Sequence, residues 1–191
     1  WFKRKEKGIT TATEDKKDIR PQDGPAYTAG ILMGKRRNGR FVVADVFNQR
    51  LNAADVQAAI LNTAKSDKAI YKRVKIRLNQ DPGQAGKAQA EQYMKLLQGF
   101  SISIRRETGS KETRAEPFSA QWLGVRGSEM GHVDILLAPW NEVYFSQLES
   151  FPESKFKDMV DSSATAFDEL TLGATACSIS ETESDRHSPW I

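Results

Sequence analysis

The chain reads Asp81-Pro82-Gly83-Gln84-Ala85-Gly86-Lys87 at the point that decides its fold, directly after an alternating apolar and polar run over residues 74–79. This alternation predicts a half-buried strand, and apolar side chains at helical spacing predict a helix over residues 85–98. Asp81 would therefore lie at the carboxyl end of a strand, where open α/β sheets place their ligands. Asp-Pro-Gly fits a plain β-turn equally well on local sequence alone. A nucleotide P-loop is excluded, because that motif needs a glycine at position 81 and a hydroxyl at position 88.

The elements on either side extend this unit. A second alternating strand over residues 100–104 completes a β-α-β unit, and Asn38-Gly39 predicts a hairpin turn between two earlier strands. We expect an α/β protein with a ribonuclease H-like mixed central sheet flanked by helices. The other expected elements are strands over 27–33, 40–47 and 133–137, and helices over 52–64 (capped by Asn52), 111–123 (with Thr113 as candidate cap), 141–150 (with Asn141 as cap) and 156–170.

Length and composition indicate one folded domain. The 191 residues are 39% hydrophobic and 28% charged, as in an ordinary globular protein. Residues 1–25 are polar and lack apolar periodicity, so they predict a linker or an incomplete first-strand region. Residues 26–170 form the expected domain, and residues 171–191 read as a polar, disordered tail.

The residue inventory limits the metal chemistry. Cys177 is the single cysteine and His132 and His187 are the two histidines, so a zinc site of thiolates and imidazoles is not expected. A metal site would be built from carboxylates, which suit Mg²⁺ or Mn²⁺. The net charge of +3 permits a polyanionic partner. Without a signal region or an apolar run of about 18 residues, an intracellular protein is expected.

Two acids mark the last predicted helix. Asp158 and Asp161 are three residues apart and share one helix face near its amino-terminal half. Acids in a first turn are stabilised by the helix dipole and need no function to explain them. Asp81 offers another carboxylate that this fold would bring nearby, and such a group around two ions can hydrolyse a phosphodiester.

Four motifs follow one another in a recognisable order: Asp81–Lys87 (DPGQAGK), Lys111–Phe118 (KETRAEPF), Pro139–Asn141 (PWN) and Phe156–Asp161 (FKDMVD). With these motifs the chain resembles, over most of residues 27–170, the carboxy-terminal nuclease domain of tailed-phage terminase large subunits. The resemblance implies a two-metal endonuclease of ribonuclease H-like fold, which uses Mg²⁺ or Mn²⁺ to cut concatemeric viral DNA during genome packaging.

The resemblance assigns roles residue by residue. Asp81 matches the second metal-binding acid and Asp158 the last one, and both are expected to be catalytic. Asp161 matches a nearby acid that assists in binding the metal. Lys111 and Arg114 match a basic landmark expected to contact DNA phosphates, with Lys87 as a further DNA-binding candidate.

The chain departs from the family pattern in two places. The family's first metal-binding acid lies on an opening strand, which residues 1–20 do not contain; Glu14 and Asp15 are weak substitutes. Lys157 stands where the family commonly has another acid, which would weaken metal binding.

The resemblance also implies partners. These are double-stranded DNA, an amino-terminal ATPase motor in a longer protein, a portal and a small terminase subunit, in the cytoplasm of a bacterial host and without a membrane. Two alternatives remain open from the sequence. One is a nuclease-inactive DNA-binding or assembly module of the same fold, and the other is an unrelated α/β hydrolase of small phosphate esters.

Overall fold

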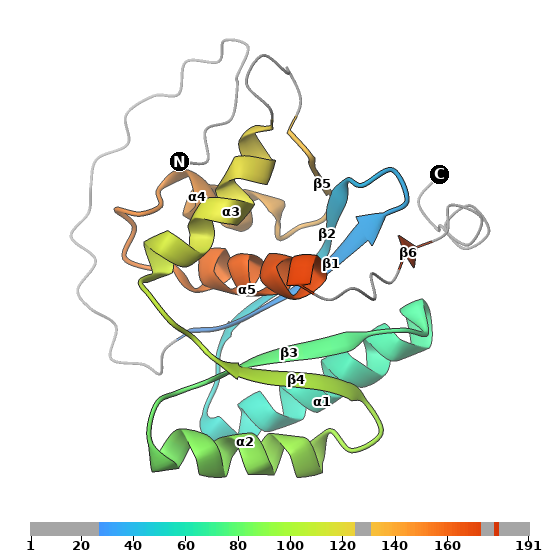
Figure 1. The fold of residues 1–191 in the computed structure, drawn as a ribbon, viewed down its shortest axis with the longest axis vertical. Helices are drawn as coiled ribbons and strands as arrows, with labels where there is room; N and C mark the ends of the chain where they lie inside the picture. The colour runs from blue at the N-terminus through green and yellow to red at the C-terminus, as the bar shows by residue number, and fades with distance from the viewer. Residues whose placement is uncertain (1–26, 125–130, 173–177, 180–191) are drawn as a thin grey trace.

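The structure is a computed structural model that describes residues 27–124, 131–172 and 178–179 (Figure 1). The described part is an α/β fold of six strands and five helices, which confirms the expected class. The expectations for residues 1–25, for Glu14 and Asp15 and for most of the tail fall outside the described residues. In chain order the elements are β1 (Tyr27–Arg36), β2 (Phe41–Arg50), α1 (Ala53–Tyr71), β3 (Lys75–Gln80), α2 (Gln84–Leu96), β4 (Ser101–Arg106), α3 (Lys111–Leu123), β5 (Val133–Ile135), α4 (Asn141–Glu149), α5 (Asp158–Leu172) and β6 (Ser178–Ile179).

The larger sheet is mixed and has the strand order β5-β2-β1-β6. β1 and β2 form the expected antiparallel hairpin, while β5 pairs parallel with β2 and β6 parallel with β1. At the hairpin turn, Gly39 takes a φ of 86°, and the Asn38 side chain accepts a hydrogen bond from the backbone N–H of Arg40 at 3.1 Å. Asn-Gly suits this turn because both residues tolerate unusual backbone angles.

The smaller sheet consists of β3 and β4, which run parallel and are connected by α2. This is the expected β-α-β unit. In the described part of the chain its strands do not hydrogen-bond to the larger sheet, so the strands form two groups where one central sheet was expected. Figure 1 shows α5 lying between the two groups, with α1 and α2 on the far side of β3 and β4.

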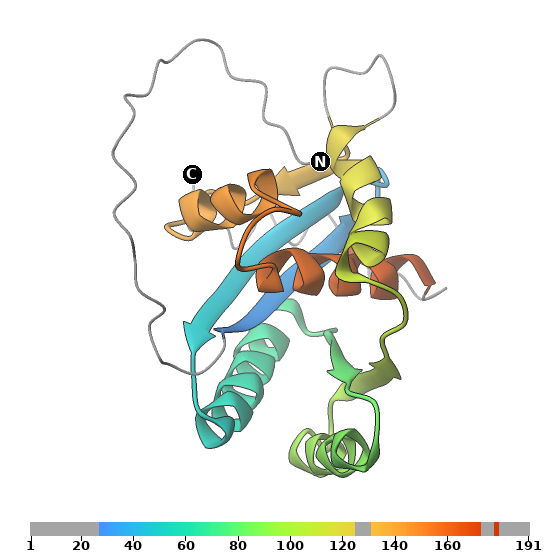
Figure 2. The same cartoon turned by 90° about the vertical axis from the view of Figure 1, so that its left-hand side faces the viewer.

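The core lies under α5, which packs on the larger sheet with α3 and α4 beside it (Figure 2). Phe167 contacts the rings of Phe41 and Phe118 at centroid distances of 4.8 and 5.9 Å. Burying each such ring stabilises the fold by roughly 1.5–3 kcal/mol. The buried residues of α5 are Met159, Val160, Ser163, Ala164, Phe167 and Glu169. α5 therefore holds a fixed position against the sheet, and this fixes the direction of the polar residues at its start.

Several helix ends and caps differ from the sequence expectation; α2 ends at Leu96, before residue 98, and α5 begins at Asp158, after residue 156. α1 continues to Tyr71, well past residue 64, while its expected N-cap Asn52 is confirmed by a 3.0 Å hydrogen bond from the N–H of Asp55. Ser110, not Thr113, caps α3, because the Ser110 hydroxyl accepts from the N–H of Thr113 at 3.2 Å.

Asn141 is the first residue of α4 and not its cap. Its side chain instead holds the preceding loop, since it accepts from the N–H of Ala138 at 2.6 Å and donates to the carbonyl of Leu136 at 3.0 Å. Among the described residues, no helix has the length and apolar character needed to cross a membrane.

Candidate functional site

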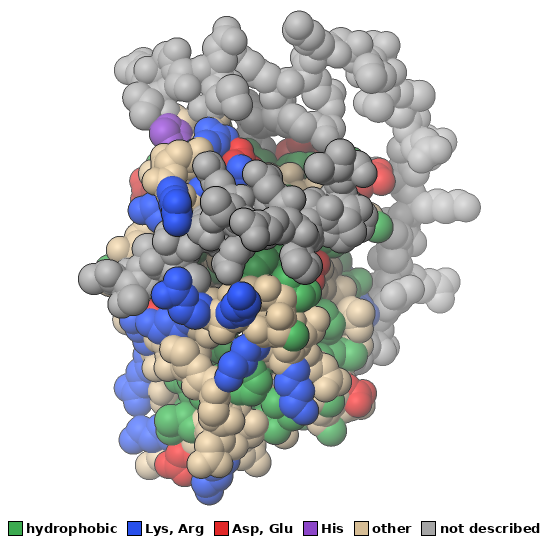
Figure 3. All heavy atoms as spheres, turned by 90° about the vertical axis from the view of Figure 1, so that its right-hand side faces the viewer, with side chains coloured by type: hydrophobic (Ala, Val, Ile, Leu, Met, Phe, Trp, Pro, Cys, Tyr) green, Lys and Arg blue, Asp and Glu red, His purple; other side chains and the backbone are tan. Residues whose placement is uncertain are grey.

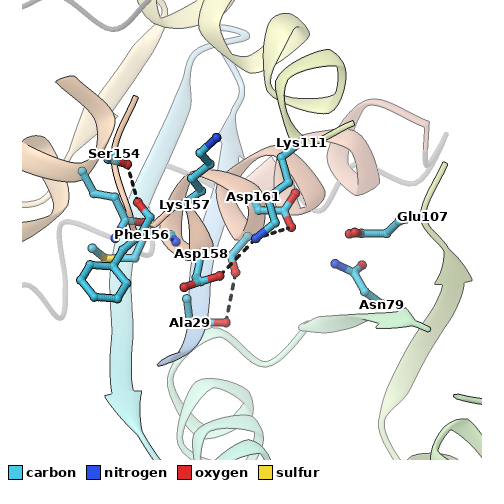
Figure 4. A network of polar contacts seen from close by, with 12 residues as sticks. Ala29, Asn79, Glu107, Lys111, Ser154, Phe156, Lys157, Asp158 and Asp161 are labelled. Carbon is cyan, nitrogen blue, oxygen red and sulfur yellow. Dashed lines mark hydrogen bonds and ion pairs between the residues drawn. The ribbon is translucent and has the colours of Figure 1, made fainter. Parts of the chain in front are cut away.

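Two acids and two bases meet where α5 begins. Asp158 and Asp161 lie in the first turn of α5, and Lys111 and Arg114 lie in the first turn of α3. Each pair is three residues apart, so each presents both side chains on one helix face. The Lys111 ammonium lies 3.1 Å from Asp158 Oδ1 and 3.7 Å from Asp161 Oδ2 (Figure 4). The two helix starts thus form a matched set of opposite charges.

Arg114 bridges two carboxylates. Its Nη2 donates to Asp161 Oδ1 at 2.6 Å and also lies 2.8 Å from Glu107 Oε2. A third bond, from Nη1 to the carbonyl of Gly109 at 2.9 Å, fixes the guanidinium in place. The planar fork of arginine suits this use, because its five donors have a rigid geometry. Arg114 therefore brings Glu107 and Asp161 into the same cluster.

Glu107 is a site residue that the sequence interpretation missed. It directly follows β4, and because β3 and β4 are parallel it emerges at the same edge of the sheet as Asn79 at the end of β3. Thr165 of α5 connects the two, donating to Glu107 Oε1 at 3.2 Å and accepting from Asn79 Nδ2 at 3.3 Å. The available signal was an acid placed immediately after an alternating strand, the same signal that singled out Asp81.

The cluster carries a net negative charge. Asp158, Asp161 and Glu107 contribute three negative charges, and Lys111 and Arg114 contribute two positive charges, which leaves one negative charge. Asp161 is the more enclosed aspartate, with 13% of its side chain exposed against 34% for Asp158. Oxygen donors with a net negative charge suit a hard divalent cation.

Lys157 does not join this cluster. Its ammonium donates to Glu112 Oε1 at 3.0 Å. A backbone hydrogen bond at Glu112, together with bonds from Lys157 and Ser110, lowers the pKa of the Glu112 carboxyl to about 2. Glu112 thus supplies Lys157 with a counter-charge next to the site.

Asp81 is exposed in the loop between β3 and α2. The loop is built around glycines: Gly83 has a φ of 95°, and a Cβ on Gly86 would lie 2.0 Å from the carbonyl oxygen of Asp81. Lys87 is exposed in the first turn of α2. The structure therefore brings Asp158, Asp161, Lys111 and Arg114 together and leaves Asp81 and Lys87 on the neighbouring loop and helix.

The carboxylates of this cluster are chemically suitable ligands for a hard divalent cation. Their arrangement suits such an ion less well. In the described ranges no three residues among His, Cys, Asp and Glu are grouped so that they could hold a metal ion. The cations Lys111 and Arg114 already pair with the oxygens of Asp158 and Asp161. An ion bound to these carboxylates would have to compete with both bases.

One comparison with known proteins gives a match. A family model described as the terminase RNaseH-like domain matches residues 17–170, which is more than half of the chain. No curated protein and no solved structure matches the chain.

Proposed function

The chain belongs to the family of terminase RNase H-like domains, and from this premise we propose that it is the nuclease of a DNA-packaging terminase. In this proposal the chain is a divalent-metal-dependent endonuclease that cuts concatemeric viral DNA during genome packaging by two-metal hydrolysis of the phosphodiester. Double-stranded DNA is its substrate. An ATPase motor in the same protein, a portal and a small terminase subunit are its proposed partners, in the cytoplasm of a bacterial host.

The observation that carries the proposal is the matched set of charges at the starts of α3 and α5, next to the carboxyl ends of β3 and β4. Asp158 and Asp161 would hold the metal, with Asp81 contributing from the β3–α2 loop. Bound Mg²⁺ or Mn²⁺ would activate a water molecule and stabilise the leaving oxygen.

Lys111 and Arg114 also have a role in DNA binding in this proposal. Lys111 and Arg114 now neutralise carboxylates, and a DNA phosphate offers the same kind of anionic oxygen. Arginine binds carboxylates and phosphates through the same fork of donors. With a metal ion held by the carboxylates, Lys111 and Arg114 would be available to position the phosphate.

The test is cleavage of supercoiled plasmid with Mn²⁺ or Mg²⁺ by the wild type, by Asp81→Ala and by Asp158→Asn, with an EDTA control. We expect cleavage that requires the metal and both acids, with a loss of about 10²-fold or more in each variant. Asp168→Asn is the matched control, because Asp168 is an exposed acid on the same helix, far from its start, and it should retain cleavage. If both site variants cut as well as the control, these acids are not the site.

One observation favours a second candidate, a nuclease-inactive DNA-binding or assembly module of the same fold. The acids of α5 are ion-paired with bases, and no metal-binding group of three is assembled among the described residues. This candidate predicts salt-sensitive DNA binding without cleavage under any divalent ion.

A further inference from the structure

Positive charge is concentrated in one stretch that the candidate site does not use. From Lys65 to Arg77 the chain has six Lys or Arg residues and one acid, Asp67. This excess of five is larger than the net charge of +3 of the whole chain. The stretch therefore carries more excess positive charge than the chain as a whole.

The fold gathers these cations at one end of the molecule. α1 ends at Tyr71, Lys72 follows as its C-cap with a φ of 56°, and β3 begins at Lys75. The chain thus turns sharply from helix to strand. We call the resulting surface the basic end; it consists of the exposed residues Lys65, Lys68, Lys72, Arg73 and Lys75.

Lys and Arg side chains are concentrated on the side of the molecule that carries the basic end. Figure 3 faces the side on which α1 runs into β3, and Lys and Arg side chains are spread over its described part, with few Asp or Glu. Asp67 is half-buried, and burial together with the charge of Asp45 on β2 raises its pKa to about 6. Burial and another acid therefore both disfavour the charged form of the one acid in the stretch.

Lys75 of the basic end and the neighbouring Arg77 and Arg105 contact one buried carboxylate, that of Glu169. Glu169 of α5 accepts from Lys75 at 2.5 Å and lies 3.5 Å from Arg77 and 3.4 Å from Arg105. The charges of Asp168 and Glu107 also act on Arg77. The side chains of Lys75 and Arg105 are 45% and 41% exposed, so both cations are accessible to an outside anion.

Helix stability explains only part of this pattern. A cation in the last turn of a helix is favoured by about 0.3–1 kcal/mol, and Lys68 also donates to the carbonyl of Gly99 at 3.0 Å. Neither effect explains why five cations are exposed on one surface. A concentration of positive charge of this kind attracts a polyanion.

The spacing suits DNA. Glu169 follows Asp158 by eleven residues on α5, which is about 16 Å along the helix axis. Successive phosphates of one DNA strand are about 3.4 Å apart along the duplex axis, so this distance corresponds to about five base pairs. A duplex with one phosphate at Asp158 is long enough to reach the basic end.

We propose that the basic end binds the phosphate backbone of the same duplex DNA that reaches the start of α5. The contact does not depend on the base sequence. It holds the duplex in a fixed position relative to the candidate site. This inference rests on the proposed function for its substrate, but it concerns binding and not cleavage.

The test is fluorescence anisotropy of a duplex of about 20 base pairs in EDTA, where no metal-dependent cleavage occurs, over a series of salt concentrations. The variant is Lys65→Gln/Lys72→Gln/Arg73→Gln. We expect about tenfold weaker binding at about 0.1 M salt, and a salt slope that is smaller by about 0.9 for each lost phosphate contact. Two controls should bind within about twofold of the wild type: the charge-preserving Lys65→Arg/Lys72→Arg/Arg73→Lys, and Lys155→Gln before the start of α5.

A triple variant with wild-type affinity and slope would overturn the inference, and so would a wild type that does not bind DNA in EDTA. If the triple variant does not fold, the single variant Lys65→Gln tests the inference. Its salt slope is expected to be smaller than that of the wild type by about 0.9. Plasmid cleavage tests the proposed function separately. If the triple variant loses binding and the wild type does not cleave, DNA binding by the basic end is supported and the nuclease function is rejected. If the wild type cleaves and the triple variant binds as well as the wild type, the nuclease function is supported and DNA binding by the basic end is rejected.

Discussion

Lys111 lies where it would compete most directly with a metal ion for the oxygens of the two aspartates. Its ammonium lies between Asp158 and Asp161, at 3.1 and 3.7 Å from their carboxylate oxygens. A side chain in this position neutralises the site and competes with any divalent ion that needs the same oxygens. The pair is partly exposed, with 38% of Lys111 and 34% of Asp158 accessible, so its contribution is of the size of a surface ion pair, up to about 1 kcal/mol.

We therefore expect Lys111→Gln to bind Mn²⁺ about fivefold more tightly than the wild type, which corresponds to about 1 kcal/mol. The measurement is the free Mn²⁺ signal in an EPR titration without DNA. Lys155→Gln changes the net charge equally and should leave the affinity unchanged. An unchanged or weaker affinity in Lys111→Gln would show that the two aspartates do not hold the ion.

Asp67 gives the stability of the protein a defined pH dependence. Burial and the charge of Asp45 raise its pKa from 3.8 to about 6. Between these values the folded state binds the proton more tightly than the unfolded state does, so the free energy of unfolding falls as pH rises from about 4 to 6. The full shift corresponds to about 3 kcal/mol, and because the group is only half-buried we expect about 1 kcal/mol.

Asp67→Asn should consequently be about 1 kcal/mol more stable than the wild type at pH 7.5 and nearly equal to it at pH 3.5. Urea denaturation at the two pH values measures this difference. A gain of equal size at both pH values would contradict the assignment to the Asp67 charge.

At the scale of single elements, the loop from β3 to α2 is the most constrained. Gly86 lies inside the first turn of α2, where the backbone of Asp81 approaches it so closely that an added Cβ would meet the carbonyl oxygen at 2.0 Å. Backbone atoms cannot move aside as a flexible side chain can. The glycine thus lets the strand end fold back on the helix that follows it, and this close approach sets the position of Asp81.

For this reason Gly86→Ala should destabilise the protein by about 1–3 kcal/mol, the usual cost of an overpacked site. Gly30→Ala is the matched control, since a Cβ there would lie 3.7 Å from Phe47 Cβ, an ordinary contact, and should cost less than about 1 kcal/mol. Urea midpoints at constant m-value report the difference. Equal losses in the two variants would mean that the β3–α2 loop relaxes freely.

At the scale of the whole molecule, α5 joins two groups of strands that are not hydrogen-bonded to each other in the described part of the chain. It packs on the larger sheet through Phe167 and its neighbours. It reaches the smaller sheet through Glu169, whose side chain is only 6% exposed and contacts Lys75, Arg77 and Arg105. Burial opposes the charged form of Glu169, but bonds from Lys75 and Ser103 and the nearby cations outweigh it and lower the pKa of the carboxyl.

Glu169→Gln should accordingly destabilise the fold by about 3 kcal/mol, because Arg77, at 9% exposure, would keep its charge without a carboxylate beside it. Asp168→Asn, an exposed neighbour on the same helix, should stay within about 0.5 kcal/mol of the wild type. Chemical denaturation measures both. A similarly small effect of Glu169→Gln would mean that the two sheets are held together without this ion cluster.

The elements were predictable because their signals are local. Alternation identified β3 and β4, and the Asn38-Gly39 turn identified the hairpin, since a strand period and a turn conformation depend on residues next to each other in the chain. Helix ends were less predictable. Ser110 and Thr113 are both good caps by type, and only the hydrogen bond between them shows that Ser110 is the one used.

The sequence by itself determined the class of fold, the order of its elements, the family resemblance and the spacing that puts Asp158 and Asp161 on one face of a helix. Only the tertiary structure decided that the strands form two groups, that Arg114 joins Asp161 to Glu107, and that Lys157 pairs with Glu112. The physical reason is the separation along the chain of the residues that interact. Helices, strands and turns follow from short-range backbone preferences, whereas an ion pair depends on the distance between residues such as Lys111 and Asp158, which are 47 positions apart in the chain.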